Sequence, residues 1–246
     1  QALKLGLITR NPSNVVSKPK LIRAEMKVLN DSQVRTLLLA AYETEYYALF
    51  YIAVSTGLRQ GEILGLKWSD LDWTTRHLRI QRQLQRVDGK GLIFCEPKSR
   101  ASRRTIVLGR SAIEALRTHI EDQQIQRQTA GDEWVENDLI FTSSIGTPID
   151  PRNIFRIYKE LLKTAGLPNL RFHDLRHTAA TIMLQENVHP KVVQERLGHS
   201  DISLTLNTYS HVMPGMQEEA ADKIDEVLTM VDVKGALMKA KTEQAR

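Results

Sequence analysis

The chain has 246 residues, of which 41% are hydrophobic and 26% charged, and its formal net charge is +5. These values are those of an ordinary globular protein with one substantial core, and no apolar run has the length of a transmembrane helix. The single cysteine, Cys95, excludes an internal disulfide framework, so we expect a cytoplasmic protein. Because there is no transmembrane run, we expect no membrane partner.

Positive charge is concentrated at the start of the chain. Residues 1 to 30 hold six lysines and arginines against one glutamate, and this excess equals the net charge of the whole chain. Lys18 and Lys20 flank Pro19 in a stretch that is typical of an extended basic linker. Residues 218 to 226 instead hold five acidic residues against one lysine. We therefore expect the two ends of the chain to have different partners.

Three helices are expected between residues 30 and 66. The first follows the capping-box signal Asn30-Asp31-Ser32-Gln33, and its apolar residues recur at helical spacing. The second ends at Gly57, and the third begins just after it, with Arg59 at its start and Glu62 one turn later. An arginine and a glutamate three residues apart most often form an exposed surface pair. This pair alone therefore does not indicate a function.

A small antiparallel sheet is expected in the next part of the chain. Three β-rich runs are separated by the turn signals Asp88-Gly89 and Lys98-Ser99-Arg100, and the runs cover residues 78–83, 92–95 and 105–108. This interpretation places Lys98 at the tip of a hairpin, with Arg100, Arg103 and Arg104 following it. A charged turn is usually only a solvated turn, so Lys98 has no assigned role on this pattern alone.

Two more helices and a short buried strand lead to the last third of the chain. An amphipathic helix is expected over residues 111–125, and the strand over residues 139–141. Asp150-Pro151 is typical of a helix start, and Gly166 ends that helix, which carries Tyr158 among apolar neighbours. We expect Tyr158 to lie in the core. With these elements the fold class is α+β and mainly α-helical, with a small antiparallel sheet.

The segment from residue 170 to 209 gathers the side chains needed to bind and attack a phosphodiester without a metal. A helix is expected to begin near His173, with its apolar residues toward the core and with His173 and Arg176 on one face. A short helix then ends at Gly198, a left-handed C-terminal glycine, and presents His199 on a turn. Tyr209 follows in a poor helix. We interpret the segment as a nucleophilic active site.

A metal site is the alternative interpretation of the same histidines. His173 and His177 are four residues apart, as in a helical zinc site, but the HExxH pattern requires Glu where this chain has Asp174. No clear third ligand follows them. We therefore predict no metal, and His177 is interpreted as a structural histidine.

Two groups of residues resemble a known family. His173-x-x-Arg176, Leu197-Gly198-His199 and Tyr209 resemble the C-terminal box of the tyrosine recombinases, the phage-integrase family, and Thr56-Gly57-Leu58-Arg59 with Glu62 is similar to its first box. The resemblance implies a tyrosine-recombinase-like catalytic domain. The catalytic residues that it implies are Arg59, Lys98, His173, Arg176, His199 and Tyr209, with Glu62 supporting them.

The resemblance also implies a reaction. Tyr209 would attack a phosphate of double-stranded DNA to form a 3′-phosphotyrosyl intermediate, with His173 as the proton acceptor and Lys98 as the general acid. Arg59, Arg176 and His199 would bind the non-bridging oxygens. No metal, ATP or other cofactor is needed. The residues expected to contact DNA are Lys18, Lys20, Arg100, Arg103 and Arg104.

The family's organisation implies three parts of the chain. Because the chain begins at Gln1 and its apolar residues 2 to 7 are typical of the end of a helix, we expect residues 1–28 to be the remnant of an upstream core-DNA-binding domain with its basic linker. Residues 29–230 are the expected catalytic domain and residues 231–246 a C-terminal tail. The active form implied is a homo-tetramer on two DNA duplexes, and a monomer is expected without DNA.

Two other functions are compatible with the same residues. A type IB topoisomerase-like enzyme would use the same chemistry on one duplex as a monomer. A non-catalytic DNA-binding protein would keep the fold and lose the chemistry, but no substitution in the predicted active site favours it. A site-specific recombinase or integrase is therefore the main hypothesis.

Overall fold

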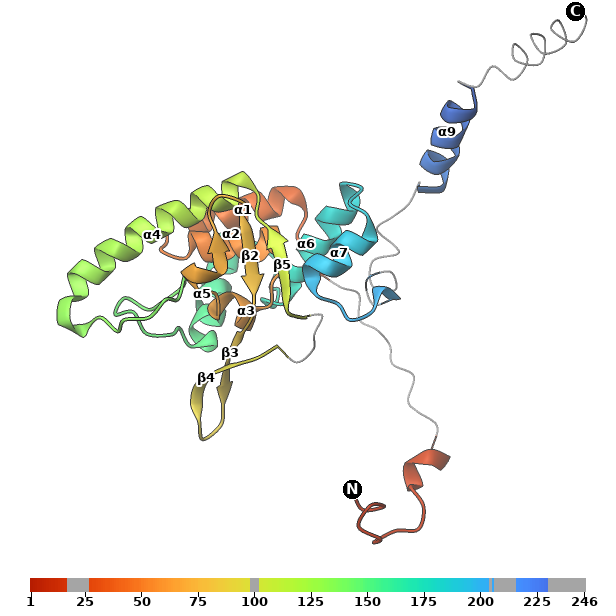
Figure 1. Ribbon diagram of the computed structural model, residues 1–246, viewed down its shortest axis with the longest axis horizontal. Helices are drawn as coiled ribbons and strands as arrows, with labels where there is room; N and C mark the ends of the chain where they lie inside the picture. The colour runs from red at the N-terminus through yellow and green to blue at the C-terminus, as the bar shows by residue number, and fades with distance from the viewer. Residues whose placement is uncertain (17–26, 98–101, 204, 206–215, 230–246) are drawn as a thin grey trace, which may run out of the picture.

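The computed structural model describes residues 1–16, 27–97, 102–203, 205 and 216–229 of the chain (Figure 1). Its helices are α1 (Asp31–Tyr42), α2 (Tyr47–Thr56), α3 (Gln60–Leu64), α4 (Arg110–Ala130), α5 (Pro151–Thr164), α6 (Asp174–Gln185), α7 (Pro190–Leu197) and α9 (Met216–Thr229), with short 3-10 turns η1 (Pro12–Val15), η2 (Trp68–Asp70) and η4 (Gly131–Glu133). Its strands are β1 (Leu71–Asp72), β2 (His77–Ile80), β3 (Gln83–Val87), β4 (Gly91–Cys95) and β5 (Arg104–Val107). The predicted α+β, mainly helical fold class is confirmed.

Capping signals place the helix boundaries close to their predicted positions. The Asn30 side chain accepts a hydrogen bond from the backbone N–H of Gln33, and the Gln33 side chain accepts one from the backbone N–H of Asn30, which completes the predicted capping box of α1. Asp150 caps α5 through the Arg152 amide, with Pro151 at the first helical position. Gly57 and Gly198 end α2 and α7 in the left-handed conformation, as predicted.

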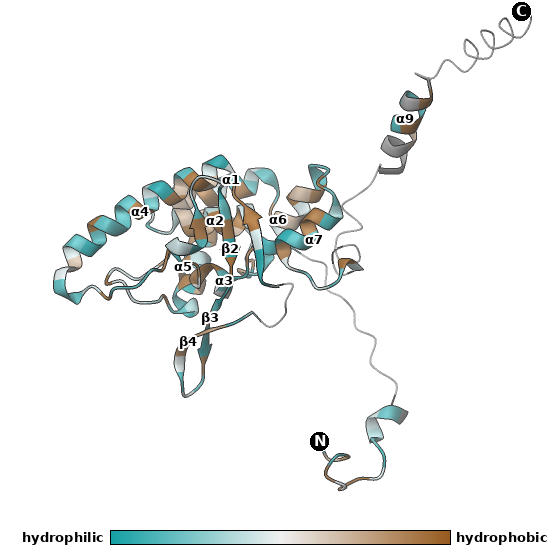
Figure 2. Cartoon of the chain, in the orientation of Figure 1, coloured by the Kyte–Doolittle hydropathy of each residue, from teal (hydrophilic) through white to brown (hydrophobic). Residues whose placement is uncertain are grey.

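The core lies where α2 meets its neighbours. Nearly all of α2 is buried, and this helix contacts α1, α4 and α6. Figure 2 shows the apolar residues gathered on the central helices, while much of the outer α4 is hydrophilic. Phe50 of α2 stacks on Tyr158 of α5, and Phe172 packs against both rings. Tyr158 is therefore a core residue, as predicted.

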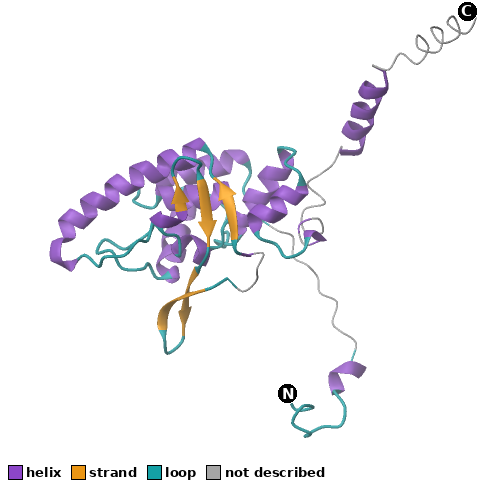
Figure 3. Ribbon diagram, in the orientation of Figure 1, coloured by secondary structure: helices purple, strands orange, loops and turns teal. Residues whose placement is uncertain are grey.

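The strands form two sheets and not the single sheet expected (Figure 3). Strands β1, β2 and β5 form one antiparallel sheet, while β3 and β4 form a separate hairpin whose turn is at residues 88–90. Since β4 and β5 belong to different sheets, they do not pair with each other in the hairpin that was expected around residues 98–100. Lys98 itself lies outside the described residues. The periodicity of a strand does not reveal which partner it chooses, which is why the sequence suggested one sheet.

Three other local expectations were wrong. Residues 2–7 form turns and not the end of a helix. Residues 139–141 are buried, but only Leu139 among them makes an isolated bridge, with Lys67, and they form no named strand. Helix α4 continues to Ala130, five residues beyond its expected end, because its last turns are polar and carry no apolar spacing to predict from.

The last described element is an amphipathic helix. Figure 1 shows α9 away from the other helices. Ile224 and Leu228 are exposed on it. No helix in the described part of the chain is both long and apolar enough to span a membrane.

Candidate active site

Three helix ends bring the predicted catalytic side chains together. Arg59 is the N-cap residue of α3, His173 is the N-cap residue of α6, and His199 follows the left-handed Gly198 at the end of α7. The amides of Gly198 and His199 both donate to the carbonyl of Gln194, which fixes the turn that carries His199. Each of these three residues is therefore positioned by a helix terminus and not by a free loop.

Arg176 joins the C-terminal ends of α2 and α7 from below the surface. It is 3% exposed, and its guanidinium donates to the carbonyl of Gly57 at 2.9 Å and to the carbonyl of Leu197 at 2.6 Å. These two carbonyls close α2 and α7, where the helix dipoles are negative. The arginine thereby satisfies both helix ends and holds a fixed positive charge at the place where they meet.

Gly57 is required at this meeting point for two reasons. Its φ of 67° lies in the left-handed region, which side chains other than glycine seldom adopt. A Cβ added to it would also lie 2.5 Å from Cδ2 of Leu197 and 3.3 Å from Cβ of Ala179. Glycine is the residue that lets α7 approach α2 closely enough for one arginine to reach both ends.

Glu62 is not half of a surface pair, as its spacing from Arg59 suggested. Its side chain is 2% exposed, and its carboxylate accepts from the amide and the guanidinium of Arg59 and from both terminal nitrogens of Arg104. Burial on its own would raise the pKa of Glu62, but the hydrogen bonds and charges of Arg104 and Arg59 hold that pKa below its ordinary value. Glu62 is therefore an ionised, buried anchor.

Arg104 has a different environment from the one expected for a DNA contact. Its side chain is 7% exposed, and it donates to Glu62 and to the carbonyls of Ser102 and Arg196. Little of this guanidinium is left on the surface for a phosphate. Arg103, its neighbour, is exposed and pairs with Glu96. We therefore reassign Arg104 from the DNA surface to the interior of the site.

His173 and His177 lie on the first turns of α6 with their rings edge to face. Their centroids are 5.2 Å apart and their planes are 86° apart. The pKa of His173 is lowered to about 4, first by burial of the ring and then by the charges of His177, Arg176 and Arg59, against the opposing effect of Asp174. At neutral pH the imidazole of His173 is therefore uncharged and able to accept a proton.

His199 is also held neutral. Its Nδ1 lies 2.9 Å from Oγ1 of Thr205, which orients the ring. Burial, together with the nearby charges of Arg176 and Arg59, lowers the pKa of His199 to about 4. Since these arginines also act on His173, the two imidazoles and the two guanidiniums share one site.

The lowered pKa of His199 predicts a loss of stability in acid. An unfolded chain binds a proton at this imidazole near its ordinary pKa of 6.5, whereas the folded protein binds it only near pH 4. The contribution of His199 is therefore complete above pH 6.5 and is lost as the pH falls toward 4, by on the order of 2 kcal/mol between pH 7 and 4.5. Urea unfolding of wild type and of His199→Asn at pH 7 and at pH 4.5 measures this loss of stability. Equal losses in the two proteins would contradict the prediction.

Five of the predicted site residues lie outside the described residues. They are Lys18, Lys20, Lys98, Arg100 and Tyr209. The described residues that the structure brings together are Arg59, Glu62, His173, Arg176 and His199, and it adds Arg104 and Thr205 to them. Thr205 had no signal in the sequence, since a threonine in a poor helix is common. Among the described residues, no group of three or more His, Cys, Asp or Glu is arranged to hold a metal.

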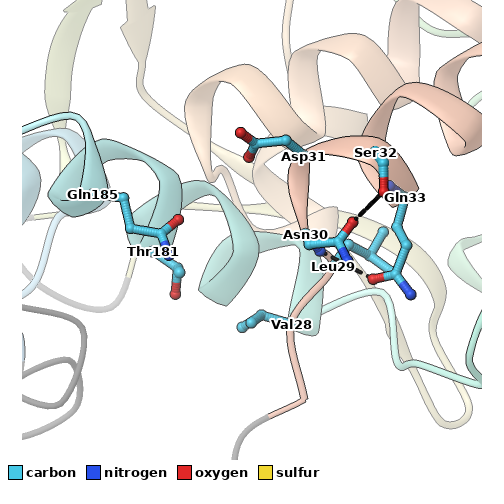
Figure 4. Close-up of a pocket in the computed structure, with 8 residues that line it drawn as sticks. All are labelled: Val28, Leu29, Asn30, Asp31, Ser32, Gln33, Thr181 and Gln185. Atoms are coloured by element: carbon cyan, nitrogen blue, oxygen red, sulfur yellow. Dashed lines mark hydrogen bonds between the residues drawn. The ribbon is translucent and has the colours of Figure 1, made fainter.

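A separate pocket lies at the other end of α6 (Figure 4). Its walls are the start of α1 and two residues from the second half of α6, Thr181 and Gln185. It contains none of the predicted catalytic residues, and the Asn30 and Gln33 side chains in it are occupied by the capping box. The pocket is therefore a consequence of how the chain enters α1 and is not the active site.

Comparison with known proteins decides the family. Residues 27–215 match the phage integrase family over more than half of the chain. The chain belongs to this family. A tyrosine recombinase XerC-like protein of Caldanaerobacter subterraneus subsp. tengcongensis is 37% identical to it over 217 residues, which are 84% of this chain and 56% of the relative. The ICEBs1 integrase of Bacillus subtilis is 28% identical, over 90% of this chain and 60% of its own.

Solved structures of the family share the fold. The Tn1549 transposon integrase, in complex with a circular intermediate DNA, has a TM-score of 0.74 at 23% identity, over 90% of this chain and 74% of that one. The XerA recombinase has a TM-score of 0.62 at 25% identity, over 82% and 66% of the two chains. The present chain spans between about half and two thirds of the length of the curated relatives named above.

Proposed function

We propose that this chain is the catalytic part of a site-specific DNA recombinase that cleaves and rejoins DNA strands through a 3′-phosphotyrosyl intermediate. One observation supports the proposal most. Two arginines and two neutral histidines, from segments more than 100 residues apart in the sequence, lie together in one site. Two fixed cations and a hydrogen-bond donor suit the non-bridging oxygens of a phosphodiester. A neutral imidazole beside them suits the removal of a proton.

The proposed reaction is a transesterification. The Oη of Tyr209 attacks phosphorus while the bond from phosphorus to the 5′-oxygen breaks, and the 3′-phosphate becomes attached to the tyrosine. His173 accepts the phenolic proton, and Lys98 gives a proton to the leaving 5′-oxygen. Arg59 and Arg176 stabilise the charge that develops on the non-bridging oxygens, with one hydrogen bond from His199. Attack by a 5′-hydroxyl of another strand reverses the steps and reseals the DNA without ATP.

The names of relatives support DNA as the partner. They are integrases and tyrosine recombinases, and one solved relative was determined with a circular intermediate DNA.

We propose that four copies of the chain act on two DNA duplexes and that the reaction takes place in the cytoplasm. The residues proposed to contact the DNA backbone are Lys18, Lys20, Arg100 and Arg103. Residues 1–28 would then be the remnant of an upstream core-DNA-binding domain with its basic linker, residues 29–230 the catalytic domain and residues 231–246 a C-terminal tail.

A nicked suicide duplex tests the proposed function. The nick lets the short 5′-ended fragment diffuse away after cleavage, so that the covalent intermediate accumulates. We expect a slowly migrating protein–DNA band on a denaturing gel, formed equally well in EDTA because the arginines replace a metal. Absence of the band, or its loss in EDTA, would contradict the proposal. Relaxation of a supercoiled plasmid by a monomer, without joining of two duplexes, would favour a type IB topoisomerase-like enzyme instead.

Replacing Lys98 by alanine is expected to slow cleavage of an ordinary phosphodiester by about 10²–10⁴-fold, the usual contribution of a general acid. A substrate with sulfur at the bridging 5′ position should restore most of the rate, because a thiolate leaves without a proton. The two rates are measured in single-turnover assays with each substrate. If Lys98→Ala cleaves the sulfur substrate no faster than the ordinary one, Lys98 is not the acid.

A further inference from the structure

Glu62 is held by two arginines that have very different exposures. Each oxygen of its carboxylate accepts two hydrogen bonds, one from Arg59 and one from Arg104, at distances between 2.7 and 3.2 Å. The Arg59 side chain is 37% exposed, whereas that of Arg104 is 7% exposed. The carboxylate therefore lies between one arginine that reaches solvent and one that does not.

This arrangement sets the net charge that Arg59 and the side chains behind it present to a ligand. If Arg59 and Glu62 were alone, their charges would cancel, and a phosphate would meet a neutral pair. Arg104 adds a second positive charge behind the carboxylate, so the three side chains together carry +1. Because the fork of Arg104 meets both carboxylate oxygens, Glu62 also cannot rotate away, and the guanidinium that it holds keeps one direction.

Arg104 also contacts the segment that carries His199. Its Nε donates to the carbonyl of Arg196 at 2.6 Å, in the last turn of α7 and three residues before His199. Its Nη1 donates to the carbonyl of Ser102, next to its own strand β5. A single buried guanidinium thus connects β5, α3 and α7, which are far apart in the sequence.

We propose that Arg104 is a positioning residue that offsets the charge of Glu62, keeps the Arg59 guanidinium aimed at the phosphate through Glu62, and holds the His199 turn through the Arg196 carbonyl. The inference rests on the proposed function of this site. A positioning residue of this kind acts through Arg59 and His199 and not by contact with the substrate. Its loss should weaken the effect of Arg59 on a phosphodiester, and a small misplacement of a reacting group is enough to slow a reaction by about 10²-fold.

A methylphosphonate substrate separates this role from a general role in folding. It replaces one non-bridging oxygen by a methyl group, so the scissile group is neutral and needs less cationic stabilisation. The measured quantity is the ratio of the single-turnover rates on the methylphosphonate and on the ordinary phosphodiester. A fraction of unfolded protein lowers both rates equally, so the ratio is independent of it.

For Arg104→Met we expect a loss of about 10²-fold on the phosphodiester and a ratio at least ten times that of wild type. Arg59→Met should shift the ratio in the same direction. Arg104→Lys restores the charge but not the fork, so its ratio should lie between those of wild type and Arg104→Met. The matched control is Arg79→Gln. Arg79 is exposed on the adjacent strand β2, and its side chain makes no hydrogen bond or ion pair with the described residues. Both of its rates should be those of wild type.

Two results would overturn the inference. A slow Arg104→Met with an unchanged ratio would make Arg104 a purely structural residue, and wild-type rates on both substrates would leave it without a role. Failure of the wild-type protein to form a covalent adduct with either substrate is a distinct outcome. It would overturn the proposed function and this inference with it.

Discussion

Replacing Arg176 by methionine is expected to slow strand cleavage by at least about 10³-fold and to destabilise the protein by about 2–4 kcal/mol. The loss of activity follows from removing a fixed cation that is already aligned by two helix ends. The loss of stability follows because the carbonyls of Gly57 and Leu197 lose a buried donor, and each unpaired carbonyl costs about 1–3 kcal/mol. Single-turnover cleavage and urea unfolding measure the two effects on one preparation.

Arg35→Met is the matched control for this prediction. Arg35 is exposed on α1, and its side chain makes no hydrogen bond or ion pair with the described residues. Its replacement should therefore change stability by no more than about 0.5 kcal/mol. Arg176→Lys keeps the positive charge but has only one nitrogen, so it should recover part of the stability and little of the activity. Wild-type stability in Arg176→Met would show that the bonds to the two helix ends contribute nothing.

Tyr209→Phe is expected to abolish covalent attachment to DNA while leaving DNA binding nearly unchanged. The substitution removes one oxygen, and that oxygen is the proposed nucleophile, so no smaller effect is compatible with the mechanism. A suicide-duplex assay measures attachment, and a gel-shift titration measures binding. A residual adduct at more than trace level in the mutant would contradict the assignment.

Tyr158→Phe supplies the control with the same chemical change at another tyrosine. The Tyr158 hydroxyl is fully buried and has no hydrogen-bond partner in the described structure, and burial raises its pKa above the ordinary value. A hydroxyl in this environment cannot reach DNA or ionise readily. We expect Tyr158→Phe to attach to DNA as fast as wild type and to be at least as stable, because a buried unpaired hydroxyl is removed.

The parts of the fold that depend on local signals could be predicted from the sequence. The capping box at Asn30, the proline after Asp150 and the glycines at 57 and 198 act within a few residues, so helix ends followed from them directly. Because Arg59 and His199 lie just beyond Gly57 and Gly198, their placement followed as well, and apolar spacing placed His173 near the start of its helix. The family resemblance added their roles but not their contacts.

The interactions that join distant segments could not be predicted in the same way. Glu62 and Arg104 are 42 residues apart, and an arginine after a charged turn looks like a surface residue. The carbonyls of Gly57 and Leu197 have no sequence signature, so the burial of Arg176 between them was not expected either. Both cases depend on which helix packs on which, and that choice belongs to the whole core and not to any local pattern.

Mapping the covalent peptide tests the central claim most directly. Wild-type protein is incubated in EDTA with a nicked suicide duplex, digested with trypsin and nuclease, and examined by mass spectrometry. The account predicts one modified peptide, carrying a 3′-nucleotide on Tyr209, and none from Tyr209→Phe. A nucleotide on any other residue, attachment through the 5′-phosphate, or an adduct that requires a divalent metal would contradict it.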